Sequence, residues 1–235
     1  MNRKFTNTIR FVMDECIPPF IRDNKWFMYP FYYLAYRGKN ISEVMNFKQR
    51  VYQFSEADYA NFYNQIDSIS RNRLTDLNAA SIEFIFTQIE LIQPKKIVDI
   101  GCGRGYLLSL IHERFPEIEL TGLDIKACHP NPPYTFVQGN IENLPFENNS
   151  FDLVLCNHTI EHLIHLSTCI HELIRVTKSN LLVVTPKQRY FYYTLDEHVN
   201  FFYQAEQLTS LFPIKNYSIK NLQGDWGYIG IVNPT

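Results

Sequence analysis

The feature that most restricts the fold is a short apolar run that passes directly into three alternate glycines. The run Val98-Asp99-Ile100 continues as Gly101-Cys102-Gly103-Arg104-Gly105, and a helical pattern follows. Glycines at this spacing allow a tight turn and let the backbone approach a ligand closely. A dinucleotide fingerprint would have its third glycine one position later, at Tyr106, so the spacing weakens the case for a pyrophosphate ligand.

Short apolar runs alternate with helical patterns along the chain, which predicts a mostly parallel sheet covered by helices. The apolar spacing predicts helices at residues 77–93, 107–115 and 159–176. Strands are predicted at residues 97–100, 119–123, 135–137, 153–156 and 181–184. Two further strand-like runs, 215–222 and 228–232, are joined across a glycine-rich turn and predict an antiparallel hairpin. The expected fold is an α/β, Rossmann-like seven-stranded sheet, mostly parallel, with this hairpin at its C-terminal end.

The first third of the chain differs from the rest in composition, because aromatic residues crowd between Trp26 and Tyr36. We therefore divide the chain into an aromatic-rich helical extension, residues 1–78, and a sheet domain, residues 79–235. Three roles are open for the extension. The first is a lid over the sheet domain, and the second is a surface that packs against that domain or against a second subunit. The third is a peripheral contact with a membrane surface.

Charge and cysteine content exclude several classes of protein. With 46% hydrophobic residues and a net charge of −2, the chain can build a core but has no basic face, so nucleic acid is not an expected partner. The five cysteines are odd in number and widely scattered, which disfavours a disulfide framework. No run of 18 apolar residues occurs, so we expect no transmembrane segment and a cytoplasmic location.

Two carboxylates flank the glycine turn. Asp99 lies two positions before the first glycine, where a carboxylate suits a cationic ligand group. Asp124 closes the next predicted strand, about 20 residues beyond the glycines, where a carboxylate can accept hydrogen bonds from two ribose hydroxyls. A third motif, Gly139-Asn140-Ile141-Glu142-Asn143-Leu144-Pro145-Phe146, precedes Ser150-Phe151-Asp152-Leu153-Val154. Together the three segments argue against a plain strand-to-helix connection.

As a set, these segments resemble the class I S-adenosylmethionine-dependent methyltransferases, especially the small-molecule group that includes the ubiquinone-pathway O-methyltransferases. The resemblance covers about residues 79–212, and the C-terminal hairpin matches the reversed last strand of that family. It implies S-adenosylmethionine as the cofactor. It also implies a cofactor site formed by Asp99, Gly101, Cys102, Gly103, Asp124, Ile125, Asn140, Ile141 and Asn157.

The resemblance also implies a role for most of these residues. Asp99 and Asn157 would lie at the methionine end of the cofactor, and Gly101 and Gly103 would pass beneath it. Asp124 would bind the ribose.

The remaining cofactor residues would bind the adenine. Ile125 would cover the ring, the Ile141 N–H would bond it, and Asn140 would accept from its amino group. The family usually has Asp at the position of Asn140, but an amide oxygen can accept the same hydrogen bond.

A histidine cluster follows the fourth predicted parallel strand. On a helix, His158, Glu161, His162 and His165 would share one face at the ligand-binding edge of the sheet. The string fits the H-x-x-E-H pattern of inverted zinc proteases, which a methyltransferase context makes a chance match. It also resembles the Glu-x-x-Glu-His of small-RNA 2′-O-methyltransferases, which add a later histidine, here His198.

Three interpretations of the cluster stay open. The first is a divalent metal held by His158, Glu161, His162 and His198, a donor set that suits Zn, Fe or Mn better than Mg. The second is catalysis without metal, with His158, His162 or His198 acting as a general base. The third is that Glu161 and His162 only cap and pack the helix.

The expected function is therefore an enzyme, a methyltransferase that acts on O or N of a small polar acceptor. Such an acceptor would be a sugar, a nucleotide-linked or lipid-linked precursor, or a phosphorylated metabolite. Two alternatives remain: a non-catalytic S-adenosylmethionine-binding partner subunit, and an RNA 2′-O-methyltransferase.

Overall fold

A computed structural model describes residues 12–55, 58–59, 61–62, 74–126 and 132–233. The chain divides into two compact units. The helical unit comprises Met1–Asn72 and the later segment Arg189–Val199, and the sheet unit comprises Arg73–Gln188 and Asn200–Thr235. This grouping differs from a single division at residue 78, because a loop from the second half of the chain belongs to the helical unit.

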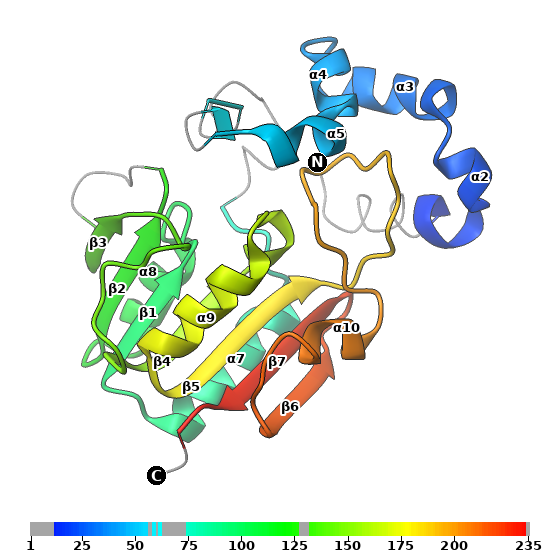
Figure 1. The fold of residues 1–235 in the computed structure, drawn as a ribbon. Helices are drawn as coiled ribbons and strands as arrows, with labels where there is room; N and C mark the ends of the chain where they lie inside the picture. Colours follow the sequence, from blue (N-terminus) through cyan, green and yellow to red (C-terminus); the bar gives the residue numbers. More distant parts are fainter. Residues whose placement is uncertain (1–11, 56–57, 60, 63–73, 127–131, 234–235) are drawn as a thin grey trace. The chain divides into compact units, whose positions relative to one another are not determined.

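The sheet unit is built on seven strands in the order β3-β2-β1-β4-β5-β7-β6 (Figure 1). Strands β1 to β5 are parallel, and β7 pairs antiparallel with both β5 and β6. This topology confirms the predicted fold class, including the reversed hairpin. The strands are β1 Lys96–Ile100, β2 Glu119–Asp124, β3 Thr135–Gln138, β4 Phe151–Asn157, β5 Thr177–Pro186, β6 Asn216–Asn221 and β7 Asp225–Ile231.

Helices cover both faces of this sheet. They are α7 Ala79–Ile92, α8 Tyr106–Arg114, α9 Leu166–Val176 and α10 Ala205–Thr209. The core on one face joins α7 and α8 to the strands, with Ile85, Ile89 and Leu108 fully buried. The core on the other face joins α9 and α10, through residues such as Leu173 and Leu208. The sheet is therefore sandwiched between two apolar layers, which explains why its central strands are apolar on both sides.

The predicted helix at residues 159–176 is wrong in its first part. After β4, His158 adopts a left-handed φ of 48°, and the chain makes only a short 3-10 turn, η4 Ile160–His162, before α9 begins at Leu166. The Asn200 amide donates to the carbonyls of Ile160 and Leu163, at 3.0 and 2.7 Å, and so takes acceptors that a continuous helix would use. The histidines of this segment therefore do not share one helical face.

The helical unit consists of short helices and a captured loop. Its elements are η1 Val12–Cys16, α2 Pro19–Arg22, α3 Lys25–Ala35, α4 Ile41–Met45, α5 Phe47–Arg50 and η2 Val51–Gln53. The loop Arg189–Val199 is bound through its backbone: Asp23 accepts from the N–H groups of Tyr192 and Tyr193, and Tyr32 donates to the Thr194 carbonyl. These contacts explain why the loop groups with helices that precede it by more than a hundred positions.

Among the described residues, no helix combines the length and the apolar character needed to cross a bilayer.

Candidate functional site

The glycine turn joins β1 to α8 at the carboxyl edge of the sheet. Gly101, Gly103 and Gly105 all have positive φ values, of 78°, 56° and 71°, which L side chains rarely adopt. The turn is tied to the end of β2, because the N–H of Gly101 donates to the Leu123 carbonyl at 2.7 Å and that of Gly103 donates to Asp124 Oδ2 at 2.8 Å. Its shape is therefore set by hydrogen bonds to the neighbouring strand.

The three glycines differ in the space around them. A Cβ at Gly101 would lie 2.2 Å from Thr159 Oγ1, and a Cβ at Gly105 would lie 1.6 Å from the Tyr134 hydroxyl. A Cβ at Gly103 would meet no atom within 4 Å. Gly101 and Gly105 are thus required by packing, whereas Gly103 leaves open space above the turn, as a ligand-binding turn requires.

Asp99 is a buried carboxylate at the end of β1, and only 3% of it is exposed. Burial raises the pKa of Asp99 to about 7. A hydrogen bond from Asn157 Nδ2, which lies 3.2 Å from Asp99 Oδ1, acts in the opposite direction and lowers the pKa. The negative charge of Asp124 raises the pKa further. A cation at this position would remove the penalty for ionising Asp99.

Asn157, at the end of β4, provides a second acceptor beside Asp99. Its Oδ1 atom is buried and has no hydrogen-bond partner among the described residues. A buried polar atom without a partner is costly unless a ligand or water completes it. Asp99 and Asn157 together therefore form an acceptor pair suited to an ammonium group.

Asp124 and its neighbours lie at the ends of β2 and β3. Each Asp124 oxygen already accepts one backbone N–H, from Gly103 at 2.8 Å and from Lys126 at 2.9 Å. A carboxylate oxygen can accept a second hydrogen bond, so both remain available to hydroxyl donors. Ile125, next in the chain, is 40% exposed and offers an apolar surface at this edge.

Asn140 and Ile141 follow β3 in a short turn. The Oδ1 atom of Asn140 accepts from the N–H of Glu142 at 3.0 Å, and Ile141 is buried in the core beneath. An amide oxygen has two lone pairs and can accept two hydrogen bonds.

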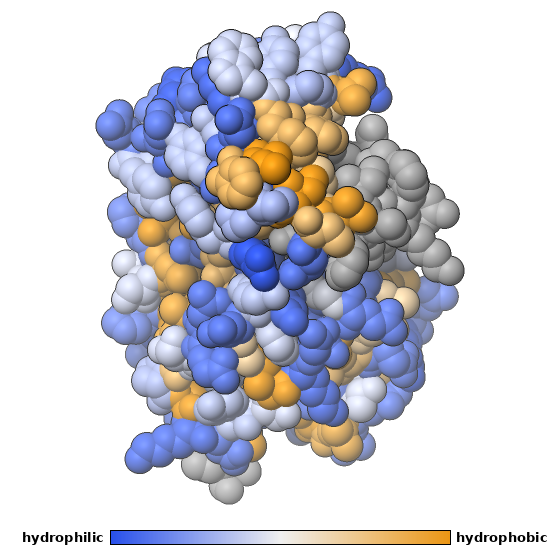
Figure 2. Space-filling model, turned by 90° about the vertical axis from the view of Figure 1, so that its right-hand side faces the viewer, coloured by the Kyte–Doolittle hydropathy of each residue, from blue (hydrophilic) through white to orange (hydrophobic). Residues whose placement is uncertain are grey.

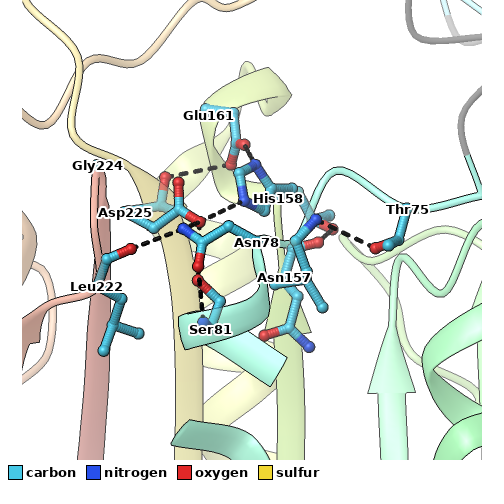
Figure 3. Close-up of polar contacts among 12 residues, drawn as sticks. Thr75, Asn78, Ser81, Asn157, His158, Glu161, Leu222, Gly224 and Asp225 are labelled. Carbon is cyan, nitrogen blue, oxygen red and sulfur yellow. Dashed lines mark hydrogen bonds and ion pairs between the residues drawn. The ribbon is translucent and has the colours of Figure 1, made fainter. Parts of the chain in front are cut away.

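The His158 side chain forms the centre of a buried ion-pair network (Figure 3). Its Nδ1 atom lies 3.3 Å from Glu161 Oε1 and its Nε2 atom lies 3.4 Å from Asp225 Oδ2. Burial alone lowers the pKa of His158, but the hydrogen bonds and charges of Asp225 and Glu161 outweigh it and raise the pKa to about 10. The imidazole is therefore protonated at neutral pH.

The raised pKa of His158 bears on two of its predicted roles, general base and metal ligand, and both stay predictions. An imidazolium donates from both nitrogens and has no lone pair left, so it acts neither as a general base nor as a metal ligand. The Glu161 carboxylate is also engaged, with Oε1 at His158 and Oε2 accepting from the Thr185 hydroxyl at 3.2 Å. The predicted metal set therefore stays a prediction, in which Glu161 already has two partners.

The network extends to residues that sequence reasoning missed. Asp225 Oδ2 accepts from Asn78 Nδ2 and from Ser81 Oγ, both at 2.8 Å, while Asn78 Oδ1 caps α7 by accepting from the Ser81 N–H at 2.9 Å. Asn78 Nδ2 also donates to the Leu222 carbonyl. Asn before an amphipathic helix is a recognisable cap signal, but nothing in the sequence pairs it with Asp225.

The other predicted catalytic histidines lie in different units. His162 is at the end of η4 in the sheet unit and is partly buried. His198 is buried in the helical unit, with Nδ1 3.5 Å from Asp196 Oδ1. Their convergence on one site stays a prediction.

Comparison with known proteins shows what the sheet unit is similar to. Residues 98–184 match the model of a methyltransferase domain. Over 100 residues the chain is 36% identical to a phthiotriol/phenolphthiotriol dimycocerosates methyltransferase of Mycobacterium ulcerans, covering 39% of this chain and 36% of the relative. A malonyl-[acyl-carrier protein] O-methyltransferase of Hahella chejuensis is 31% identical, over 49% of this chain and 48% of that protein. The chain therefore spans about a third to a half of these relatives.

Solved structures share the fold over more of the chain. The plantazolicin methyltransferase BpumL, in complex with a pentazolic desmethylPZN analog and SAH, superposes with a TM-score of 0.56 at 13% identity, over 82% of this chain and 98% of that one. A putative O-methyltransferase from Nostoc punctiforme gives a TM-score of 0.51 at 13% identity, over 64% of this chain and 55% of that one. At these identities the likeness shows the fold alone.

We predict that two glycine substitutions in the turn differ sharply in stability. Gly103→Ala should cost about 1–2 kcal/mol, the strain of a left-handed φ, whereas Gly101→Ala should cost more because its Cβ clashes with Thr159. Thermal unfolding measures both, and adding Thr159→Ala should recover part of the loss in Gly101→Ala only. Equal losses in the two single variants would contradict this account.

We also predict that His158 makes stability depend on alkaline pH. Its folded pKa of about 10 lies above the ordinary value of 6.5, so the stabilisation is complete below about pH 6.5 and is lost as pH rises through about 10. His158→Gln should lower the free energy of unfolding by about 3–5 kcal/mol at neutral pH, because two buried carboxylates lose their cation. Urea unfolding at pH 7 and 9.5 measures both effects.

His162→Gln is the matched control for His158→Gln, since it lies on the same turn with partial exposure. It should keep the parental pH slope of stability. An unchanged slope in His158→Gln would show that the network does not hold a protonated imidazole.

Proposed function

We propose that this chain, whose sheet unit is a class I S-adenosylmethionine-dependent methyltransferase domain, transfers a methyl group to an oxygen or nitrogen of a small acceptor. The observation that carries the proposal is the acceptor pair of Asp99 and Asn157 beside an open glycine turn. A buried carboxylate whose pKa is raised by burial, next to a buried amide oxygen without a partner among the described residues, is suited to an ammonium group. The cofactor's methionine moiety carries such a group.

The remaining cofactor contacts follow from the same edge of the sheet. We assign the two ribose hydroxyls to Asp124, the adenine face to Ile125, and the adenine amino group to Asn140, with the Ile141 N–H bonding the ring. Gly101, Cys102 and Gly103 would form the floor beneath the cofactor. The open space above Gly103 and the remaining acceptor capacity of Asp124 support these assignments.

In the proposed reaction, a lone pair of the acceptor atom forms the new bond to the methyl carbon as the carbon–sulfur bond breaks. The bonding electrons remain on sulfur, and the acceptor loses its proton to a base. The cofactor supplies the activated methyl group. The chain's own contribution is positioning, because holding two reactants in line removes much of the entropic barrier. The rigid turn and the anchored ends of β1, β2 and β4 are suited to this task.

Fewer residues are proposed as the general base than the sequence analysis offered. Because its pKa is raised to about 10, we do not propose His158 as the base, and we propose His162 or His198 for that role. A divalent metal is not part of the proposal, because two of the four expected ligands, His158 and Glu161, are already paired with each other.

The acceptor class remains broad in this proposal. Relatives act on phthiotriol dimycocerosates, which are lipids, and on malonyl groups bound to an acyl-carrier protein. We therefore propose a small polar or amphiphilic acceptor, including sugar, lipid-linked, nucleotide-linked and phosphorylated compounds. Screening these classes with radiolabelled S-adenosylmethionine and the purified chain tests the activity directly.

We predict that cofactor affinity depends on the ionisation of Asp99. The affinity for S-adenosylhomocysteine should rise with pH through about 7, as Asp99 ionises. It should fall again at higher pH, once the cofactor's own amino group loses its proton. Calorimetry from pH 5.5 to 9 measures this profile. The variant Asp99→Asn should bind S-adenosylhomocysteine more weakly, and its affinity should no longer rise with pH through about 7. A flat profile in the parent below pH 7.5 would place the amino group elsewhere.

We predict that Asp124→Ala weakens cofactor binding by about 1.5–3 kcal/mol, the scale of hydrogen bonds to a charged group. Asp152→Ala is the matched control, because Asp152 bonds the N–H groups of Lys95 and Lys96 at the opposite edge of the sheet. It should change stability and leave affinity unaltered. Equal affinities for Asp124→Ala and the parent would contradict the ribose assignment.

A further inference from the structure

Helix α3 of the helical unit has an apolar surface on two sides. One side is buried through Met28 and Tyr32, which are 0% and 2% exposed, and it anchors the helix to its own unit. The other side carries Trp26, Tyr29 and Tyr33, which recur at intervals of three and four residues and are 80%, 44% and 54% exposed. Residues at this spacing share one face of a helix. The exposed side is therefore a continuous aromatic stripe that is not needed for the unit's core.

Neighbouring residues enlarge this stripe. Leu34 on α3 is 76% exposed, and α2, which contacts α3, adds Phe20 at 79% and Ile21 at 37%. We call these residues the aromatic face: Phe20, Ile21, Trp26, Tyr29, Tyr33 and Leu34. Figure 2 shows orange residues and pale residues of intermediate hydropathy side by side in its upper part. Single exposed apolar residues are ordinary, but a grouped set of this kind marks an interaction surface.

The charge around the aromatic face is positive. Lys25, Arg37 and Lys39 are all exposed. Residues 18–45 are all described, and within them Asp23 and the exposed Glu43 are the two acidic residues. The Asp23 carboxylate accepts from the N–H groups of Tyr192 and Tyr193, so it is directed at the captured loop. The surface therefore combines aromatic side chains with three exposed cations against one exposed carboxylate.

We propose that the aromatic face docks the protein peripherally on the surface of an anionic phospholipid membrane. Tryptophan and tyrosine are the side chains favoured at the boundary between headgroups and acyl chains, because they have an apolar body and a polar tip. Exposed lysine and arginine beside them are attracted to anionic headgroups. The inference does not depend on the proposed methyl transfer, since it rests on the helical unit alone.

A second copy of the chain is a poorer occupant of the same face. In a twofold-symmetric dimer the same patch faces itself. Lys25, Arg37 and Lys39 of one copy would then approach the same cations of the other, and like charges brought together destabilise such an interface. An anionic membrane gives each of these cations a partner instead.

Co-sedimentation with lipid vesicles tests the proposal in the 235-residue chain. We expect binding to vesicles of phosphatidylcholine with about 30% phosphatidylglycerol, and much weaker binding to pure phosphatidylcholine, since each cation near an anionic surface contributes about fivefold. The variant Trp26→Ser with Tyr33→Ser should reduce binding at least tenfold. Arg37→Gln with Lys39→Gln should reduce it about 25-fold, and added salt should weaken binding by the parent.

Leu91→Ser is the matched control, because Leu91 on α7 is an equally exposed apolar residue, at 73%, in the sheet unit. It should bind vesicles like the parent. Tryptophan fluorescence gives a second readout: anionic vesicles should shift the parent's emission to the blue, and Trp26→Phe should lose that shift, since Trp226 is the other tryptophan and lies in β7.

Three results would overturn the proposal. The first is no binding to either kind of vesicle by folded parent protein. The second is an equal loss of binding in Leu91→Ser. The third is a concentration-dependent dimer in light scattering that Trp26→Ser with Tyr33→Ser abolishes, which would assign the face to a second copy. A failure of methyl transfer in the acceptor screen would leave the vesicle result unaffected, so the two proposals fail independently.

Discussion

The sheet unit depends on one buried cation held between two buried carboxylates. His158 follows β4, Glu161 lies in the η4 turn, and Asp225 begins β7, so a single imidazolium joins three segments. Asp225 also binds the N-terminal cap of α7 through Asn78 and Ser81. Removing one member of such a network leaves an uncompensated charge, whereas the complete network fixes one arrangement of the segments.

The position of this network explains how the fold fixes the backbone at the carboxyl edge of the sheet, where we propose that the cofactor binds. His158 directly follows Asn157, whose side chain donates to Asp99, so the ion pairs fix the backbone that presents the acceptor pair. The left-handed φ of His158 directs the chain away from the strand and into η4. Thr159, in that turn, packs against Gly101, so the same turn also constrains the glycine loop. His158 thus acts on the site through other residues.

Sequence reasoning predicted the parts of this arrangement that are local. The glycine turn, the parallel strands and the reversed hairpin each have a short-range signal in residue spacing, and the topology confirms them. The break before α9 could not be predicted, because the carbonyls of Ile160 and Leu163 are taken by Asn200, a residue remote in sequence. The protonation of His158 was missed for the same reason: Glu161 was visible nearby, but Asp225 was not.

The same argument applies to the helical unit, where long-range contacts reassign a loop. The segment Arg189–Val199 follows β5, yet its backbone groups are satisfied by Asp23, Tyr32 and other side chains of the N-terminal helices. A loop lacks regular partners for its N–H and C=O groups, so whichever side chains satisfy them determine the unit it belongs to. His198 lies in this segment, which means that any chemistry it performs depends on the N-terminal helices as much as on the sheet. The histidines grouped by sequence spacing therefore belong to different parts of the structure. His158 is a cation in the buried network of the sheet unit, and His198 lies in the helical unit.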